Sequence, residues 1–158
     1  MKKIIVLIGI PGSGKSTYAN SFKEKKGYII FSSDEYRKIL LGNEEDQSSN
    51  KFIFEKLRED VSTLASNYDG DIIIDSTNIS KRNRKCWIDI ANKYNFKCVA
   101  VYFNVRIDEC LRRISNRERK VPSHVLYRMN KNFEYPTYEE GFCEIIKNPK
   151  GENNGKWI

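Results

Sequence analysis

A short apolar segment, followed at once by a glycine-rich turn and then by a helix-like segment, opens this 158-residue chain. Residues 4–8 are Ile-Ile-Val-Leu-Ile, and residues 9–17 read Gly-Ile-Pro-Gly-Ser-Gly-Lys-Ser-Thr. A plain strand-to-helix turn needs neither a lysine nor a serine, so the pattern GxxxxGK[ST] is typical of a loop that binds phosphate groups. The residues that fill its fixed positions are Gly9, Gly14, Lys15 and Ser16.

Each residue type in this loop has a separate physical task. Glycines let backbone N–H groups turn toward phosphate oxygens, and the positive end of the following helix adds to the attraction. The Lys15 ammonium can reach the β- and γ-phosphates of a nucleotide, and the Ser16 hydroxyl can ligate Mg²⁺. The sequence therefore predicts ATP as a phosphate donor and Mg²⁺ as cofactor, with donor-binding residues Gly9, Pro11, Gly12, Ser13, Gly14, Lys15, Ser16 and Thr17.

The composition is that of a soluble protein of one domain, with 39% hydrophobic and 31% charged residues. No apolar segment approaches membrane length and no signal peptide is evident, so we expect a cytoplasmic protein without a membrane partner. The cysteines, Cys86, Cys98, Cys110 and Cys143, form no CxxC pair, which indicates reduced thiols. The net charge of +7 favours a polyanionic partner, although a generally basic proteome would also account for it.

Apolar segments and helical patterns alternate along the chain, which predicts an α/β fold: a three-layer P-loop NTPase fold with a central parallel sheet, helices on both faces and a helical lid. The predicted strands are residues 3–8, 28–31, 71–75, 97–103 and 142–146. The predicted helices, each with a Ser, Asp or Asn suited to capping, are residues 15–25, 34–41, 50–66, 80–94, 108–117 and 123–132. We expect one domain over 1–147, with its lid at about 108–132, and a polar tail or linker start at 148–158.

In an open parallel sheet, ligands bind beyond the carboxyl ends of the strands, and an acid follows the second predicted strand there. Asp34 is our candidate for the base that takes a proton from an acceptor hydroxyl, although a helix cap is an equally simple reading of an acid at this position. Arg37, one helical turn on, is a candidate for binding the acceptor; the alternative is an exposed helix arginine.

The third predicted strand ends in a second polar group. Asp75 occupies the position of an acid that holds Mg²⁺ beside a phosphate-binding loop. No Glu follows it and no Asn-Lys-x-Asp motif occurs, which argues against a motor ATPase and a GTPase. Thr77 and Asn78 offer hydrogen bonds to an acceptor, while capping of the next helix explains Asn78 about equally well.

A basic segment follows the fourth predicted strand. Arg113 and Arg117 lie four residues apart, so both project from one face of a helix. Two guanidinium groups over a phosphoryl group in transfer would offset its developing charge, and Arg117 is a candidate catalytic residue in this role. A solvated helix face is the alternative, but the place of the segment favours a kinase lid.

These motifs together resemble the kinase module of the 5′-polynucleotide kinases, the phage-type and bacterial RNA-repair enzymes. The resemblance runs from Met1 to about Ile146 and rests on the order and spacing of its motifs. They are the loop at 9–17, Ser-Asp-Glu-Tyr-Arg at 33–37, Asp-Ser-Thr-Asn at 75–78, the lid arginines, Val-Pro at 121–122 and Pro-Thr-Tyr-Glu-Glu-Gly-Phe at 136–142.

The resemblance implies transfer of the γ-phosphate of ATP to the 5′-hydroxyl end of RNA or DNA. It implies that Asp34 is the general base, that Arg37 contacts the acceptor strand, and that Arg113 and Arg117 close over the donor phosphates. No Asp-x-Asp-x-Thr phosphatase motif occurs, so the chain is either a stand-alone kinase or the kinase domain of a larger repair protein. Assembly into a homo-oligomer remains open.

Two other functions remain open at this point. A P-loop kinase of the same fold can phosphorylate a small molecule or a hydroxyl carried by a tRNA. A regulatory protein can bind a nucleotide without turning it over, although it would need neither an acceptor base nor lid arginines.

Overall fold

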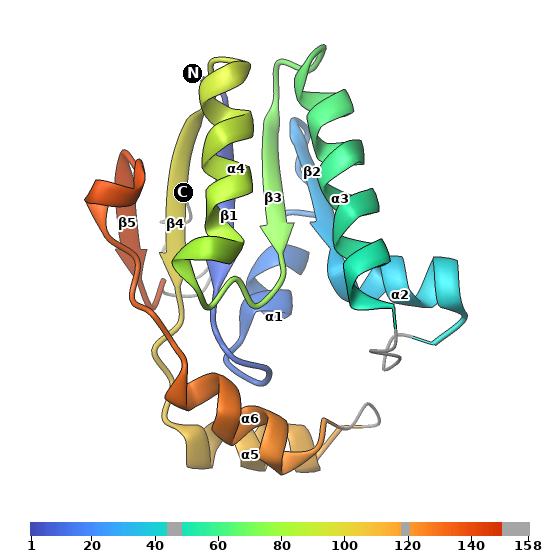
Figure 1. Cartoon of the computed structure of the whole chain (residues 1–158), viewed down its shortest axis with the longest axis vertical. Coiled ribbons are helices and arrows are strands. Elements are labelled where there is room, and N and C mark those ends of the chain that lie inside the picture. Colours follow the sequence, from blue (N-terminus) through green and yellow to red (C-terminus); the bar gives the residue numbers. More distant parts are fainter. Residues whose placement is uncertain (44–48, 118–120, 150–158) are drawn as a thin grey trace.

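The computed structural model describes residues 1–43, 49–117 and 121–149, and its central sheet is wholly parallel. The strands lie in the order β2-β3-β1-β4-β5 (Figure 1). Strand β1 is therefore central, with β3 and β2 on one side of it and β4 and β5 on the other. They are β1 Lys3–Ile8, β2 Tyr28–Ser32, β3 Asp71–Asp75, β4 Lys97–Tyr102 and β5 Glu144–Lys147. The predicted strands are thus confirmed, with ends that shift by one or two residues.

The helices occupy the predicted segments in the predicted order. They are α1 Lys15–Asn20, α2 Ser33–Leu41, α3 Asn50–Ala65, α4 Lys81–Lys93, α5 Ile107–Ser115 and α6 Ser123–Lys131. A short 3-10 helix, η1, covers Tyr138–Glu140. The predicted tail, from residue 150 on, lies outside the described residues, as does part of the polar loop that follows α2.

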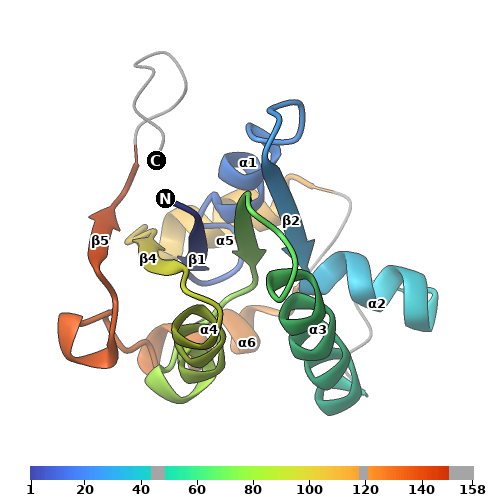
Figure 2. The same ribbon diagram turned by 90° about the horizontal axis from the view of Figure 1, so that it is seen from above.

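Helices cover both faces of the sheet, so the domain has three layers (Figure 2). Alternate residues of β1 point to opposite faces: Ile4, Val6 and Ile8 pack with residues of α3 and α4, whereas Ile5 and Leu7 pack with Tyr18 and Phe22 beyond the other face. A sheet that is buried on both faces explains why β1 and β3 read as continuous apolar segments. The predicted fold class is confirmed.

Helix α1 ends five residues earlier than predicted. Ser21 donates its hydroxyl to the carbonyl of Tyr18 at 2.6 Å, and the N–H groups of Phe22 and Lys23 bond to carbonyls three residues back. Such side-chain competition and tight turns end a helix without a glycine or proline. The Phe22 ring fits between Tyr18 and Tyr28, with centroid distances of 5.2 and 4.8 Å.

Helices α5 and α6 form a separate layer across the carboxyl ends of the strands (Figure 1). Their shared apolar cluster contains Cys110, Ile114 and Leu126, and Ile10 of the glycine-rich loop is buried in it. The loop and the lid helices therefore pack as one unit. The four cysteines form no disulfide with one another. No described helix is both long and apolar enough to cross a membrane.

We expect the contact between α3 and the sheet to carry much of the stability. Leu57 is fully buried, whereas Leu40 on α2 is 41% exposed. Leu57→Ala should lower the free energy of unfolding by about 2–5 kcal/mol, and Leu40→Ala by less than about 1 kcal/mol, because only the first leaves a cavity. Urea denaturation of both variants measures this difference. Equal losses for the two would contradict the packing described here.

Candidate active site

The glycine-rich loop curls at the carboxyl end of β1. Gly12 and Gly14 have φ angles of 84° and 104°, in the left-handed region that favours glycine. A Cβ on Gly12 would stand 2.7 Å from the main-chain oxygen of Cys110, so only glycine lets the loop approach α5 this closely. The Lys15 ammonium lies over the loop and donates to the carbonyl of Ile10 at 3.0 Å.

The electrostatics of the site converge on Lys15, which is only 7% exposed. Burial lowers the pKa of its ammonium to about 8, while the carboxylates of Asp75 and Asp34 act in the opposite direction. The Arg117 guanidinium lowers the pKa of Lys15 further. These effects place two predicted carboxylates and one predicted lid arginine within electrostatic reach of the loop lysine.

Ser16 and Asp75, the residues predicted to hold Mg²⁺, lie in direct contact. The Ser16 hydroxyl donates to Oδ2 of Asp75 at 3.0 Å. Magnesium in phosphate-transfer sites takes few protein ligands and completes its shell with water and substrate phosphates. One hydroxyl and one carboxylate beside a phosphate-binding loop fit this donor set. The described residues hold no group of three or more His, Cys, Asp or Glu side chains suited to another metal site.

Ser32, rather than Asp34, caps helix α2. The Ser32 hydroxyl accepts a hydrogen bond from the N–H of Glu35 at 3.3 Å. The simple reading of Asp34 as a helix cap is therefore excluded. Strand register places Ser32 opposite Asp75, so Asp34 lies near the start of its helix at the same edge of the sheet as Asp75, which is predicted to hold Mg²⁺.

Arg37 is buried rather than exposed, and it holds Asp34 from one side. Its Nη1 donates to Oδ1 of Asp34 at 2.8 Å. Its Nε and Nη2 donate to Oδ1 of Asn50 at 3.2 and 3.0 Å, and its guanidinium lies 5.8 Å from the ring centroid of Phe54. Helix α3 thus orients Arg37, and Arg37 orients the candidate base.

Of the two predicted lid arginines, Arg113 contacts the loop directly. Arg113 donates from Nη1 to the carbonyl of Gly12 at 3.1 Å, and its Nε contacts Glu109 at 3.1 Å. Arg113 and Arg117 both line the cavity described below. Arg112, on the same helix, contacts Glu109 outside this cavity. Helix α5 ends at Ser115, so Arg113 lies on the helix and Arg117 just beyond it. The predicted helix over 108–117 is thus too long at its end, and the two arginines reach the cavity wall from different local structures rather than from one helix face.

Thr77 and Asn78 take different positions. Thr77 lines the cavity, and its carbonyl accepts from the N–H of Gly9 at 2.9 Å. Asn78 is 3% exposed, donates its amide to the carbonyl of Leu7 at 2.8 Å and accepts from the indole N–H of Trp87 at 3.0 Å. Asn78 was open to two interpretations, acceptor binding or a structural role as a helix cap. Its contacts are those of a structural residue, although Ser80 rather than Asn78 caps α4.

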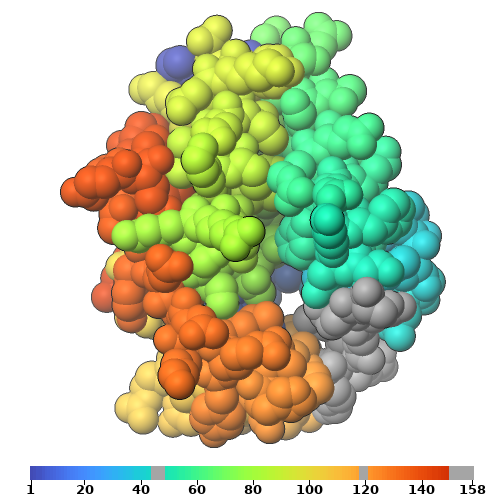
Figure 3. Space-filling view, viewed as in Figure 1, coloured from blue at the N-terminus to red at the C-terminus, as the bar shows by residue number. Residues whose placement is uncertain are grey.

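One cavity of about 940 Å³ joins these groups. It runs from the glycine-rich loop past Asp34 and Asp75 to the lid, and a hollow between α6 and the ends of α3 and α4 is visible in Figure 3. Ligand sites in proteins range from about 300 to 1,000 Å³, so this cavity is at the large end. It has room for a second substrate beside a nucleotide.

Sequence reasoning missed several residues of the cavity wall. They come from α3, the start of α4, the lid and the segment after β5: Asn50, Phe54, Asn83, Val125, Arg128, Met129 and Asn148. None belongs to a motif, and each reaches the cavity only through the packing of distant segments. The helical spacing of Val125, Arg128 and Met129 was the one signal that they share a face.

Comparison with known proteins agrees with this geometry. The family model described as "AAA domain" matches residues 4–136. The chain is 29% identical over 153 residues to the bifunctional polynucleotide phosphatase/kinase of Schizosaccharomyces pombe, a match that covers 94% of this chain and 34% of that protein. It is 25% identical over 143 residues to the L-seryl-tRNA(Sec) kinase of Methanococcus maripaludis, covering 84% of this chain and 53% of the other. The chain thus spans a third to a half of these relatives.

A solved structure of the Pnkp1/Rnl/Hen1 RNA repair complex contains a chain of the same fold. The TM-score is 0.71 at 22% identity, over 83% of this chain and 43% of that one. The predicted resemblance to polynucleotide kinases is confirmed at the level of the family. On the evidence of its phosphate-binding loop, its parallel sheet and the family model, this chain belongs to the AAA domain family and is similar in sequence to polynucleotide kinases.

Proposed function

We propose that this protein transfers the γ-phosphate of ATP to the 5′-hydroxyl end of a nucleic acid. The observation that carries the proposal is the position of Asp34. It lines the same cavity as the phosphate-binding loop, and buried Arg37 holds its carboxylate. Nucleotide binding alone requires no such carboxylate, so this arrangement favours a phosphotransferase over a regulatory nucleotide-binding protein.

The proposed reaction is an in-line displacement. Asp34 accepts the proton of the acceptor hydroxyl, the hydroxyl oxygen bonds to the γ-phosphorus, and the bond from that phosphorus to the β–γ bridging oxygen breaks to release ADP. Lys15, Arg113 and Arg117 offset the negative charge on the phosphoryl oxygens. Mg²⁺, held through Ser16 and Asp75, would supply further charge neutralisation on the phosphates when it is bound.

Three observations support a nucleic acid as acceptor. The net charge is +7, which suits a polyanion. The cavity extends past Asp34 to Arg128 of α6 and Asn83 of α4, well beyond the phosphate-binding loop. The S. pombe relative, which is 29% identical, is described as a polynucleotide phosphatase/kinase.

A hydroxyl carried by a tRNA is the second candidate acceptor. It is favoured by the match to the seryl-tRNA kinase, which covers 84% of this chain. Both acceptors are polyanions, so charge does not distinguish them. They differ in the hydroxyl group that receives the phosphate: the 5′-hydroxyl of the nucleic acid or a hydroxyl carried by the tRNA.

The acceptor is tested by incubating the protein with γ-labelled ATP and Mg²⁺ and with matched acceptors. These are 5′-hydroxyl RNA and DNA oligonucleotides, the same oligonucleotides with a 5′-phosphate, seryl-tRNA, nucleosides and sugars. We expect label only on the 5′-hydroxyl oligonucleotides, with an apparent affinity that falls steeply as salt rises. Label on seryl-tRNA or a sugar alone would overturn the proposal.

Removal of the proposed base should slow phosphate transfer strongly while ATP binding is retained. Asp34→Asn should lower kcat by a factor of about 10² to 10⁴, because the amide cannot accept the proton. The Kd for ATP should stay within about twofold. Glu35→Gln, at the exposed neighbouring position on α2, is the matched control and should leave both values unchanged. Retained activity in Asp34→Asn would remove Asp34 as the base.

The lid arginines should act on the transition state more than on binding. Arg117→Ala should lower kcat at least about tenfold and weaken ATP binding less than that, because the guanidinium offsets charge that develops during transfer. Arg112→Ala, on the preceding helix α5 but outside the cavity, serves as the control. Steady-state kinetics separate the two effects, and a change in KM alone would exclude the proposed role of Arg117.

A further inference from the structure

Arg84 on helix α4 is fully buried although it lies outside the cavity. Its neighbours Lys81, Arg82 and Lys85 are exposed, so the burial is specific to this position. A buried guanidinium is costly unless its N–H groups are paired. The partners of Arg84 therefore indicate why the chain keeps a charge there.

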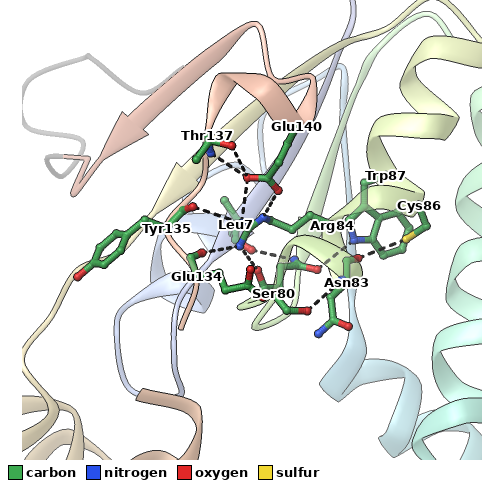
Figure 4. A network of polar contacts seen from close by, with 11 residues as sticks. Leu7, Ser80, Asn83, Arg84, Cys86, Trp87, Glu134, Tyr135, Thr137 and Glu140 are labelled. Atoms are coloured by element: carbon green, nitrogen blue, oxygen red, sulfur yellow. Dashed lines mark hydrogen bonds and ion pairs between the residues drawn. The ribbon is translucent and has the colours of Figure 1, made fainter. Parts of the chain in front are cut away.

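Every N–H group of Arg84 meets an oxygen atom (Figure 4). Its Nε and Nη2 donate to Oε1 and Oε2 of Glu140 at 2.8 and 3.0 Å, which is a bidentate ion pair. Its Nη1 donates to the main-chain oxygens of Asn78 and Glu134 at 3.0 and 2.8 Å. Its Nη2 also lies 3.5 Å from the main-chain oxygen of Tyr135.

One side of this network is the loop after β3, which follows the proposed Mg²⁺ residue Asp75 and carries the cavity residue Thr77. Asn78, whose carbonyl Arg84 binds, is itself fixed to Leu7 at the end of β1. The N–H of Gly9 donates to the carbonyl of Thr77 at 2.9 Å. Arg84 therefore holds the loop that follows Asp75 and that is hydrogen-bonded to the phosphate-binding loop.

The other side is the segment that connects the lid to the body of the domain, residues 132–140, which we call the lid root. Glu134 and Tyr135 come three and four residues after the last residue of α6, Lys131, and the N–H of Glu134 donates to the carbonyl of Ile79 at 2.8 Å. Glu140 also accepts from the N–H of Thr137 at 2.8 Å. Burial raises the pKa of Glu140, but its bonds to Arg84 and Thr137 outweigh this and leave the pKa below its usual value, so the Glu140 carboxylate is ionised at neutral pH.

We propose that Arg84 is a positioning residue for phosphoryl transfer: paired with Glu140, it fixes the lid root to the loop after β3. The inference rests on the proposed kinase function and adds a residue to it. Stability alone does not require the pair, because apolar side chains of similar volume stabilise a core at least as well as a buried ion pair. Fixed geometry does require it, since a fork of five N–H groups sets the direction of each bond.

The kinetic test compares two changes from carboxylate to amide. Glu140→Gln breaks the buried ion pair, and Asp89→Asn changes the exposed pair Lys85–Asp89 on the same helix, whose side chains are 74% and 59% exposed. We expect kcat of Glu140→Gln to fall about tenfold with KM for ATP changed less than about twofold, because misplaced groups slow transfer more than they weaken binding. Asp89→Asn should match the unaltered protein. A kcat of Glu140→Gln within twofold of that protein would overturn the proposal.

Arg84→Lys provides the second variant, since it keeps the charge but loses the fork. It should reproduce the fall in kcat, because an ammonium cannot bind Glu140, Asn78 and Glu134 in this geometry. Full activity in Arg84→Lys would mean that transfer needs only a positive charge at this position, which would overturn the positioning role. If neither Arg84→Lys nor Glu140→Gln folds, the pair serves stability alone, and the positioning role is likewise overturned.

Hydrogen exchange tests the coupling without any acceptor. In folded Glu140→Gln, amide exchange should rise together in residues 76–80 and 132–140, while the amides of β1 remain protected. A rise in one segment alone, or an equal rise throughout, would contradict the link. If the unaltered protein phosphorylates no oligonucleotide, the proposed acceptor is wrong, yet this experiment still decides whether Arg84 joins the lid root to the loop.

Discussion

The parallel alignment of β1 with β3 is the constraint on which the site depends. The register pairs residues from Ile4 opposite Ile72 to Val6 opposite Ile74. The hydrogen bond from the N–H of Gly9 to the carbonyl of Thr77 continues the alignment past the strand ends. This alignment brings Ser16 within 3.0 Å of Asp75. Since β2 lies on the other side of β3, Asp34 emerges at the same edge. Three segments that are far apart in the sequence thus supply one cavity, as expected at the carboxyl ends of parallel strands.

The lid is joined to this edge by two kinds of contact. Ile10 and Gly12 of the phosphate-binding loop pack against Cys110 and Ile114 of α5, so one end of the lid rests on the loop itself. The other end meets the body of the domain through Arg84 and Glu140. Apolar packing tolerates small shifts, whereas a satisfied polar network specifies one arrangement. The contact of Arg113 with the loop and the place of Arg117 in the cavity wall follow from both.

Much of this could be predicted from the sequence, because the relevant signals are local. The apolar segment 4–8, the loop motif and the acids at the strand ends located the sheet, the loop and the cavity edge. The role of Asn78 stayed open because its partners, Leu7 and Trp87, are fixed only by packing. The contacts of Arg37 with Asn50 and of Arg84 with Glu140 join residues 13 and 56 positions apart, and no periodicity reveals them. Helix α1 ended early because Ser21 competes for a backbone carbonyl, an effect that propensity does not capture.

The central claim is that one cavity holds donor and acceptor, with Asp34 between them. A crystal structure with a non-hydrolysable ATP analogue, Mg²⁺ and a 5′-hydroxyl oligonucleotide tests it most directly. The account predicts the terminal oxygen at about 2.6–3.2 Å from the Asp34 carboxylate and in line with the γ-phosphate above Lys15. An oligonucleotide end bound away from Asp34, with the analogue in the loop, would contradict it.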